Sequence, residues 1–483
     1  MVGAVAALML RVIAAGFAAV LLLSVSAVAQ TTPITPITPA TQAGQPTPIT
    51  PATQAGQPTP DTQAGQPIQT SVPTGIHLGV ATCAGSNCHG ALERPPGSYV
   101  RGNEYLIWSK RDKHRQAYTV LLQEPAIRMA RALGLPDAAH QKVCLDCHAD
   151  DVPPQLRGAQ FQISDGVGCE SCHGGASGWL GIHISGATHQ QNIAAGLYPT
   201  DQPIARAEKC LSCHFGGSNK FVTHRLYGAG HPRLTFELDT YTAMEPAHFV
   251  VDQSYIARNG RVTDLQLWAT GQAVALVKQM DALIDPKNAP HGPFPEFALF
   301  DCQSCHHAYQ PLHGPRPTDT GLGPGTVKLY DASAVMLHVA AARVAPAAAK
   351  SLAMHMLALQ KASTEDWPAV QREAAAVRAI ARSLVPLMAH YNFTREDMAA
   401  LFKAEIALGT GPDNWQYSHA EQITMGLEAL VTNLKSSGYV EDGQADAMTT
   451  ALGKLYMSFP TEESFRPELF AKALKSLQPG LGR

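Results

Sequence analysis

The sequence predicts a mainly α-helical protein with little regular sheet, in which a Cys-rich region is followed by a C-terminal helical bundle. One observation is that all 10 Cys of the 483-residue chain lie in five short motifs that each end in His, the last at His306. The other is a run of Ala-rich segments after residue 325, with apolar residues spaced three and four apart, as on one face of a helix. We therefore place the domain boundary between 74–325 and 326–483.

Composition excludes one class of partner. The chain has 45% hydrophobic residues, which is ordinary for a globular protein, and a net charge of -3 with 16% charged residues. Lys and Arg do not outnumber Asp and Glu, so the chain has no excess of positive charge to neutralise phosphates. We expect no nucleic-acid partner.

The N-terminus predicts export. Arg11 precedes an apolar run from Val12 to Val25, and Ala27-Val28-Ala29 has the small-residue pattern of a signal-peptidase site. We predict a signal peptide over 1–29, or a membrane tether if this segment stays uncleaved. Residues 30–73 repeat Thr-Gln-Ala-Gly-Gln-Pro and predict a disordered Pro/Thr/Gln-rich linker. The remainder is expected to be periplasmic or otherwise exported.

Four of the motifs have the spacing Cys-x-x-Cys-His. Two thiols at this spacing can reach the two vinyl groups of one haem, and the following His then lies under the iron as an axial ligand. Each motif therefore predicts one covalently attached haem c. The four are Cys144/Cys147/His148, Cys169/Cys172/His173, Cys210/Cys213/His214 and Cys302/Cys305/His306.

The first motif, Cys83/Cys88/His89, is lengthened to four residues between the thiols. A local disulfide is its alternative explanation. Zinc is disfavoured for the set, because zinc sites pair their Cys clusters and do not require His after each second Cys. We expect five haems, with the Cys83/Cys88 haem the least secure, and five proximal ligands: His89, His148, His173, His214 and His306.

The sixth iron position separates two functions. A second His makes a haem suited to electron transfer, whereas an open position can bind a small substrate. Gly230-His231-Pro232 presents an imidazole from a rigid turn, so His231 is our first candidate for a distal ligand and His224 the next. The other His of this region stay open as candidates: His114, His140, His183, His189, His248, His291, His307 and His313.

Helices are expected on both sides of the boundary. In the Cys-rich region they are predicted over 103–123, with Asn103 as a possible cap, and over 124–134 and 263–284. Beyond it they are predicted over 328–361 with a break at Pro346, and over 366–391, 394–409, 414–437, 441–458 and 461–477. The bundle is expected to pack on the haem region or to form an oligomer face.

A family resemblance spans roughly 83–214. Trp108-Ser-Lys-Arg-Asp-Lys-His114, then Cys144-Leu-Asp-Cys-His, Gly166-Val-Gly-Cys-Glu-Ser-Cys-His-Gly174 with His183 ten residues after His173, and Cys210-Leu-Ser-Cys-His resemble the tetrahaem cytochrome c-554 family. The resemblance implies a mostly helical fold with stacked haem pairs that passes electrons between a redox enzyme and the membrane quinone system. It also implies that His114 is the distal ligand opposite His214 and His183 the one opposite His89.

The same resemblance implies a five-coordinate haem at His148. His231, which lies downstream of residues 83–214, is then the candidate distal ligand for the haem at His173. The fifth motif, the segment 223–237 and the helical half depart from the family pattern. The rival resemblance is pentahaem nitrite reductase, whose Cys-x-x-Cys-Lys motif does not occur in this sequence.

The sequence therefore predicts an exported electron-transfer cytochrome with redox-protein partners, among them a quinone-linked membrane cytochrome. The C-terminal helices are the candidate face for a homo-oligomer. The alternative is a multihaem reductase of a small nitrogen or sulfur compound, such as nitrite, hydroxylamine or tetrathionate, at an open haem held by His148.

Overall fold

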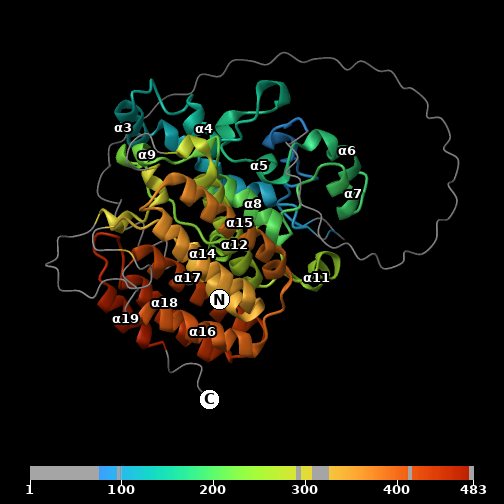
Figure 1. Cartoon of the computed structure of the whole chain (residues 1–483). Helices are drawn as coiled ribbons and strands as arrows, with labels where there is room; N and C mark the ends of the chain where they lie inside the picture. The colour runs from blue at the N-terminus through green and yellow to red at the C-terminus, as the bar shows by residue number, and fades with distance from the viewer. Residues whose placement is uncertain are drawn as a thin grey trace, which may run out of the picture. The chain divides into compact units, whose positions relative to one another are not determined.

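Helices make up nearly all the regular structure of the chain (Figure 1). The structure is a computed structural model that describes residues 75–94, 98, 100–289, 295–306, 322, 326–411 and 416–477. Within these residues the one sheet is the antiparallel pair of β1 (Gly216–Gly217) and β2 (Lys220–Phe221), with Gly216 opposite Phe221. The mainly α fold class is confirmed. The predicted signal peptide and linker lie outside the described residues.

The Cys-rich region is built from short helices. Its α-helices before residue 260 are α2 (Glu104–Arg111), α3 (Glu124–Leu133), α4 (Lys142–His148), α5 (Cys169–His173), α6 (Leu180–His183), α7 (His189–Ala194), α8 (Pro203–His214), α9 (His224–Gly228), α10 (Leu238–Met244) and α11 (Gln253–Asn259). Single 3-10 turns lie before α2, between these helices and after α12, at Val80–Thr82, Lys113–Gln116, Thr119–Leu122, Pro154–Leu156, Ile163–Asp165, Ala176–Gly178, Pro286–Asn288, Phe297–Leu299 and Cys302–Ser304.

The helix predicted over 103–123 is interrupted. Asp112 has an extended backbone and ends α2, and its carboxylate accepts a hydrogen bond from the backbone N–H of His114 at 2.9 Å. An Asp that bonds its own backbone two residues on favours a turn over a continued helix. Asn103 precedes α2 but makes no side-chain cap hydrogen bond. The helix predicted over 124–134 is present as α3, which ends at Gly134 with a left-handed backbone, φ 72°.

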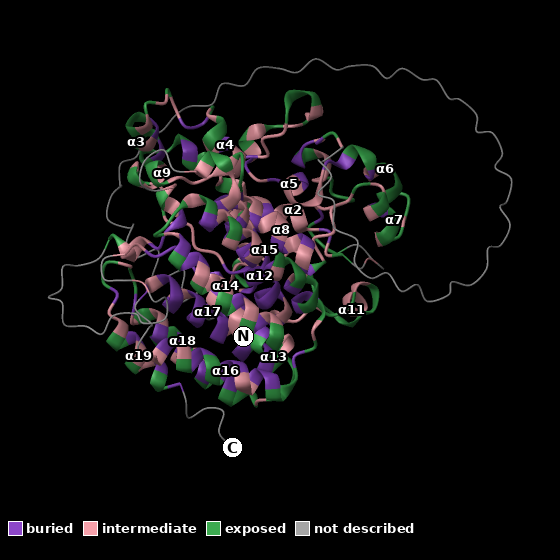
Figure 2. Cartoon of the chain, viewed as in Figure 1, coloured by how far each residue is buried: buried purple, intermediate pink, exposed green. Residues whose placement is uncertain are grey.

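The long helix α12 (Asp264–Ile284) joins the two regions, close to the predicted 263–284. It begins with a capping box in which Thr263 and Gln266 bond each other's backbone N–H groups. It is buried on nearly all sides (Figure 2), and packs against α8 of the Cys-rich region and against α15 of the C-terminal region. A helix with this burial has neighbours around its whole circumference.

The C-terminal helices lie close to their predicted positions. The first is divided at Pro346, as expected, because Pro removes a hydrogen bond in a helix interior but fits the first turn of a new helix. The helices are α13 (Ala332–Val344), α14 (Pro346–Ala362), α15 (Trp367–His390), α16 (Arg395–Thr410), α17 (Tyr417–Ser436), α18 (Asp442–Met457) and α19 (Pro467–Lys475). The last starts six residues later than predicted.

The main hydrophobic core belongs to α12 and the C-terminal helices. Its fully buried members include Trp268, Leu276, Leu337, Leu384 and Leu430. Pro73–Arg483 forms one compact unit, so the bundle packs on the Cys-rich region and does not stand apart from it. None of the described helices is both long enough and apolar enough to cross a membrane.

Candidate functional site

Three of the five motifs form the C-terminal ends of helices. His148, His173 and His214 are the last residues of α4, α5 and α8. Residues three apart lie on one face of a helix, so the two thiols of each motif share a face. The Cys302 motif forms a single 3-10 turn, and the lengthened Cys83 motif follows the turn Val80–Thr82.

Each motif His has the ring of a second His beside it. The ring centres are 6.1 Å apart for His89 and His183, 6.4 Å for His148 and His231, 6.5 Å for His173 and His248, 6.3 Å for His214 and His114, and 6.1 Å for His306 and His224. Five pairs therefore form from ten different His. Every pair combines one motif His with one His that lies outside the motifs.

These separations fit a metal ion between the two rings. Two imidazoles that bind one metal ion from opposite sides have ring centres about 6 Å apart, because each metal–nitrogen bond is about 2 Å long. Direct stacking of two rings would allow separations about 1 Å or more shorter. The donor set also fits, because two imidazoles and two thiols are the protein groups that a bis-His haem c requires.

The rings differ in their relative orientation. The planes are near parallel for His89 and His183, at 17°, and for His306 and His224, at 26°. They are nearly perpendicular in the other three pairs, at 84°, 88° and 86° for the pairs that contain His148, His173 and His214. The two kinds of pair give different low-spin spectra once an iron lies between the rings.

The pairing agrees in part with the sequence analysis. The structure brings His114 to His214 and His183 to His89, the pairs that the family resemblance implied. It places His231 against His148 and not against His173, for which His231 had been a candidate.

The position opposite His173 belongs to His248, which follows α10 in a loop. His248 was one of several open candidates, and its distance of 75 residues from His173 gave no signal in the sequence. His224 lies against His306 from the start of α9.

Several rings are held by their Nδ1 atoms, which leaves Nε2 for a metal. Nδ1 of His89 bonds a carboxylate oxygen of Glu104 at 3.0 Å, and Nδ1 of His114 bonds Asp112 at 3.1 Å. The Nδ1 of His148 lies 2.9 Å from the carbonyl oxygen of Ala117, and that of His231 lies 2.7 Å from its neighbour's carbonyl oxygen, at Pro232. Such bonds fix the tautomer and orientation of a metal-ligating His.

The most buried rings favour the neutral form. Burial lowers the pKa of His173 to about 4 and that of His214 to about 4. Burial also lowers the pKa of His183 and His231. Neutral imidazole is the form that binds a metal, so these rings are available as ligands throughout the physiological pH range.

The thiols of different motifs lie next to one another. All ten Cys are free. The pKa of Cys169 is raised, chiefly by its hydrogen bond with the Cys83 thiol, and that of Cys147 is raised, chiefly by its hydrogen bond with Cys213. The first motif is therefore adjacent to the third, and the second to the fourth. No local disulfide joins Cys83 and Cys88 in the described chain.

Large apolar side chains are exposed beside these His. Ile182 and Ile184 flank His183, and Ile184 is 71% exposed. Phe249, Val250 and Val251 follow His248 and are also exposed. Contiguous exposed apolar groups usually mark a surface that a ligand or partner covers. Their position at the ring pairs fits the apolar faces of haem.

Glu170 lies inside the third motif and was missed by the sequence analysis. Its side chain is buried and accepts hydrogen bonds from the backbone N–H groups of Leu78 at 2.8 Å, Gly79 at 2.7 Å and Ala176 at 2.7 Å. It thereby ties the segment that leads into the first motif to the helix of the third.

The fifth motif is held by the C-terminal region. Oγ of Ser418 donates to Asp301 at 2.8 Å, and the backbone N–H of Tyr417 donates to the side-chain oxygen of Gln303 at 2.6 Å. The amide nitrogen of Gln303 donates to the carbonyl oxygen of Glu462 at 3.4 Å. Asp301 and Gln303 flank Cys302, so α17 and the segment before α19 position this Cys.

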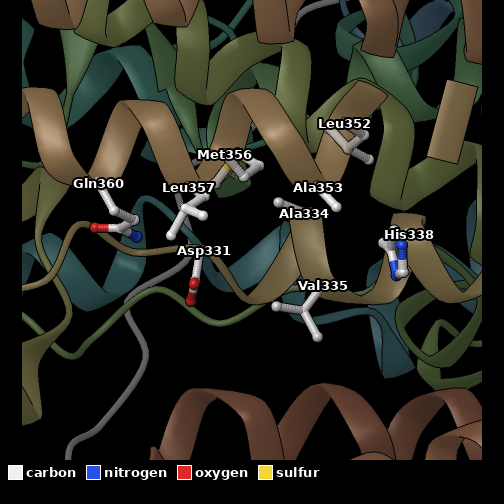
Figure 3. A pocket seen from close by; sticks show the side chains of 9 residues that line it. All are labelled: Asp331, Ala334, Val335, His338, Leu352, Ala353, Met356, Leu357 and Gln360. Carbon is white, nitrogen blue, oxygen red and sulfur yellow. The ribbon is translucent and has the colours of Figure 1, made fainter. Parts of the chain in front are cut away.

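Two further features lie outside the ring pairs. Asp112, His114 and Glu245 bring their ligand atoms within 4.8 Å of one another, but His114 already belongs to a ring pair. A cavity of about 190 Å³ lies between α13 and α14 (Figure 3). Apolar side chains line most of it, with Asp331, His338 and Gln360 as its polar groups. None of the haem motifs contributes to this cavity.

Comparison with known proteins agrees with the first part of the site. Residues 82–174 match the model of the family described as cytochrome c554 and c-prime. Searches of curated proteins and of solved structures found no match. The matched segment contains the first three motifs and the segment that carries His114. This similarity, which covers a minority of the chain, supports a haem-based electron-transfer protein of the cytochrome c class with covalently bound c-type haem.

Proposed function

We propose that the protein is an exported pentahaem c-type cytochrome that carries electrons through a series of bis-His haems. The observation that carries this proposal is the set of five His–His pairs, each with one motif His and ring centres 6.1–6.5 Å apart. Haem c supplies reversible one-electron chemistry at its iron. The chain supplies thiols for attachment, two axial imidazoles for each haem and burial.

The reductase alternative requires an open iron position. His148 was its candidate, and the geometry supports His231 as the second ligand there. Nδ1 of His231 is engaged with a backbone carbonyl, so the ring is held with Nε2 available. The arrangement therefore favours electron transfer over substrate reduction at this haem.

The adjacency of the motifs supports transfer between haems within one chain. Cys83 lies by Cys169, and Cys147 lies by Cys213. The segment 224–231 supplies a His to the second pair and another to the fifth. Cys88 of the first motif and Cys305 of the fifth are exposed, which leaves these two motifs accessible to a redox partner.

The partners and location follow from this function. We propose periplasmic redox proteins as partners, with a quinone-linked membrane cytochrome among them. The predicted signal peptide over 1–29 accounts for export, and an uncleaved segment would tether the protein. The C-terminal helices are the proposed face for any homo-oligomer.

Mass spectrometry and electron paramagnetic resonance test the proposal. The purified protein is expected to carry five haems, all low-spin, with three pairs of the crossed type and two of the near-parallel type. A high-spin signal that changes when nitrite or hydroxylamine is added would overturn electron transfer as the sole function. A peptide that contains Cys83 and Cys88 without the mass of a haem would refute loading at this motif.

A variant pair sharpens this test. His231→Ala removes the proposed second ligand at His148 and is expected to convert one haem to high-spin. His140→Ala is the control, because His140 is an exposed His of the same region whose Nδ1 bonds Asp137 at 3.0 Å. A low-spin spectrum in His231→Ala would contradict the assignment of His231.

A further inference from the structure

The proposed axial His differ in the kind of group that accepts their Nδ1–H bond. The rings of His89 and His114 bond carboxylates, Glu104 and Asp112. The rings of His148 and His231, which form one pair, both bond backbone carbonyls. The first kind of acceptor is charged and the second is neutral.

Each carboxylate is fixed at its ring by a second hydrogen bond. Glu104 accepts from the backbone N–H of Gly102 at 3.1 Å through its other oxygen. Asp112 accepts from the backbone N–H of His114 at 2.9 Å through the same oxygen that bonds the ring. Asp112 is buried, and the side chain of Glu104 is 17% exposed. The carboxylates are therefore built into the two sites and are little screened by solvent.

A carboxylate on Nδ1–H makes an imidazole a stronger electron donor to its metal. A stronger donor stabilises ferric iron relative to ferrous iron, and the reduction potential falls. A backbone carbonyl is a weaker acceptor and has a smaller effect. The two kinds of bond therefore act on the potential in unequal degree.

We propose that Glu104 and Asp112 are tuning residues that lower the reduction potentials of the haems at His89 and His214 below that of the haem at His148. This inference rests on the proposed function, because it requires a haem between the rings of each pair. Both residues act through a His ligand and neither is itself a ligand.

The two haem sites that differ in their Nδ1–H acceptors lie next to each other. Cys213, from the motif paired with His114, lies against Cys147, from the motif of His148. The change from a carboxylate acceptor to carbonyl acceptors therefore falls between two adjacent haem sites. Reduced protein is expected to hold its electron preferentially on the His148 side of that boundary.

The test is a potentiometric titration of the full-length protein followed by electron paramagnetic resonance. Glu104→Gln and Asp112→Asn keep the size and the hydrogen-bonding oxygen of each side chain and remove its charge. The near-parallel and crossed signals distinguish the two sites, because the His89 pair has planes at 17° and the His114 pair at 86°.

Glu104→Gln is expected to shift the midpoint of one near-parallel signal to a more positive potential and to leave the crossed signals in place. Asp112→Asn is expected to shift one crossed signal in the same direction. Asp137→Asn is the control. Asp137 bonds the ring of His140, which is exposed and belongs to none of the five ring pairs. It should leave every midpoint unchanged.

Unchanged or more negative midpoints in both variants, with haem content and low-spin ligation intact, would overturn the proposal and leave the proposed function standing. A wild-type protein with fewer haems or a high-spin site would instead contradict the proposed function. The two variants act on different pairs, so either one tests the inference if the other fails to fold.

Discussion

The Cys-rich region and the C-terminal region achieve stability by different means. Among the described residues, the helices α2 to α11 are short and leave apolar side chains such as Ile184 exposed beside His. The helices α12 to α19 are mostly longer and bury a continuous cluster of Leu, Ala, Met and Phe side chains. The apolar clusters that lie wholly in the Cys-rich region are small. Side-chain packing therefore accounts for the second region, whereas we expect the first to use covalently bound haem as part of its core.

The largest effect is expected when haem attachment is prevented. Produced in a reducing compartment without attachment, the full chain should keep the C-terminal helices and lose ordered structure in the Cys-rich region, because the haem faces are then missing from its core. Hydrogen exchange measured by mass spectrometry checks this region by region. Peptides of α13 to α17 should stay protected and peptides of α4 to α10 should exchange rapidly. Equal protection of both sets of peptides would contradict a role for haem in the core of the Cys-rich region.

The next effect concerns a buried ion pair of the C-terminal region. Asp331 contacts Nζ of Lys328 at 2.9 Å and Nε2 of His419 at 2.8 Å. Although burial opposes ionisation, the Lys328 ammonium and the hydrogen bond with His419 lower the pKa of Asp331 to about 2. Asp331→Asn should cost about 3–5 kcal/mol of unfolding free energy at neutral pH, because it removes the carboxylate from a buried ion pair.

The folded-state pKa of Asp331 is depressed, so its contribution is present above its unfolded pKa of about 4 and is lost as the pH falls through about 2. Denaturant unfolding at several pH values measures this difference between wild type and Asp331→Asn. Asp442→Asn is the control, since Asp442 is an exposed partner of Lys435 at 3.6 Å. Equal losses in the two variants would refute the ion-pair interpretation.

The smallest effect is a gain. Glu405 on α16 is fully buried, and neither carboxylate oxygen has a hydrogen-bond partner among the described residues. Burial raises its pKa well above the usual value, so folding is opposed increasingly as the pH rises from the unfolded pKa toward the folded one. Glu405→Gln removes this cost and should stabilise the protein by about 1–3 kcal/mol at pH 7, with less gain near pH 4.

Denaturant unfolding at pH 4 and pH 7 checks that prediction. Glu396→Gln changes an exposed Glu on the same helix and serves as the matched control. A gain that is independent of pH would show that ionisation of Glu405 is not its source.

The sequence was most informative where chemistry requires a fixed spacing. Cys and His recur at the spacing that haem attachment requires, so candidate thiols and proximal ligands could be named from the sequence alone. The long C-terminal helices could be predicted from apolar periodicity and from Pro346. The resemblance added His114 and His183.

The remaining partners could not be predicted, because nothing fixes the distance in sequence between the two axial ligands of one iron. His248 comes from a loop far from His173, and His231 approaches His148 across the fold. The acceptors Glu104 and Asp112 were missed for the same reason, since their role appears only when the rings are placed.

The segment 224–231 has a consequence for assembly. His224 at its start faces His306, and His231 at its end faces His148, so one short piece of chain contributes to two ring pairs. When binding of one haem orders this segment, binding of the second haem has a smaller conformational entropy cost. If the proposed haems are present, we therefore expect maturation at the second and fifth motifs to be cooperative, so that loss of Cys302 and Cys305 weakens ligation at His148 without altering any residue of that site.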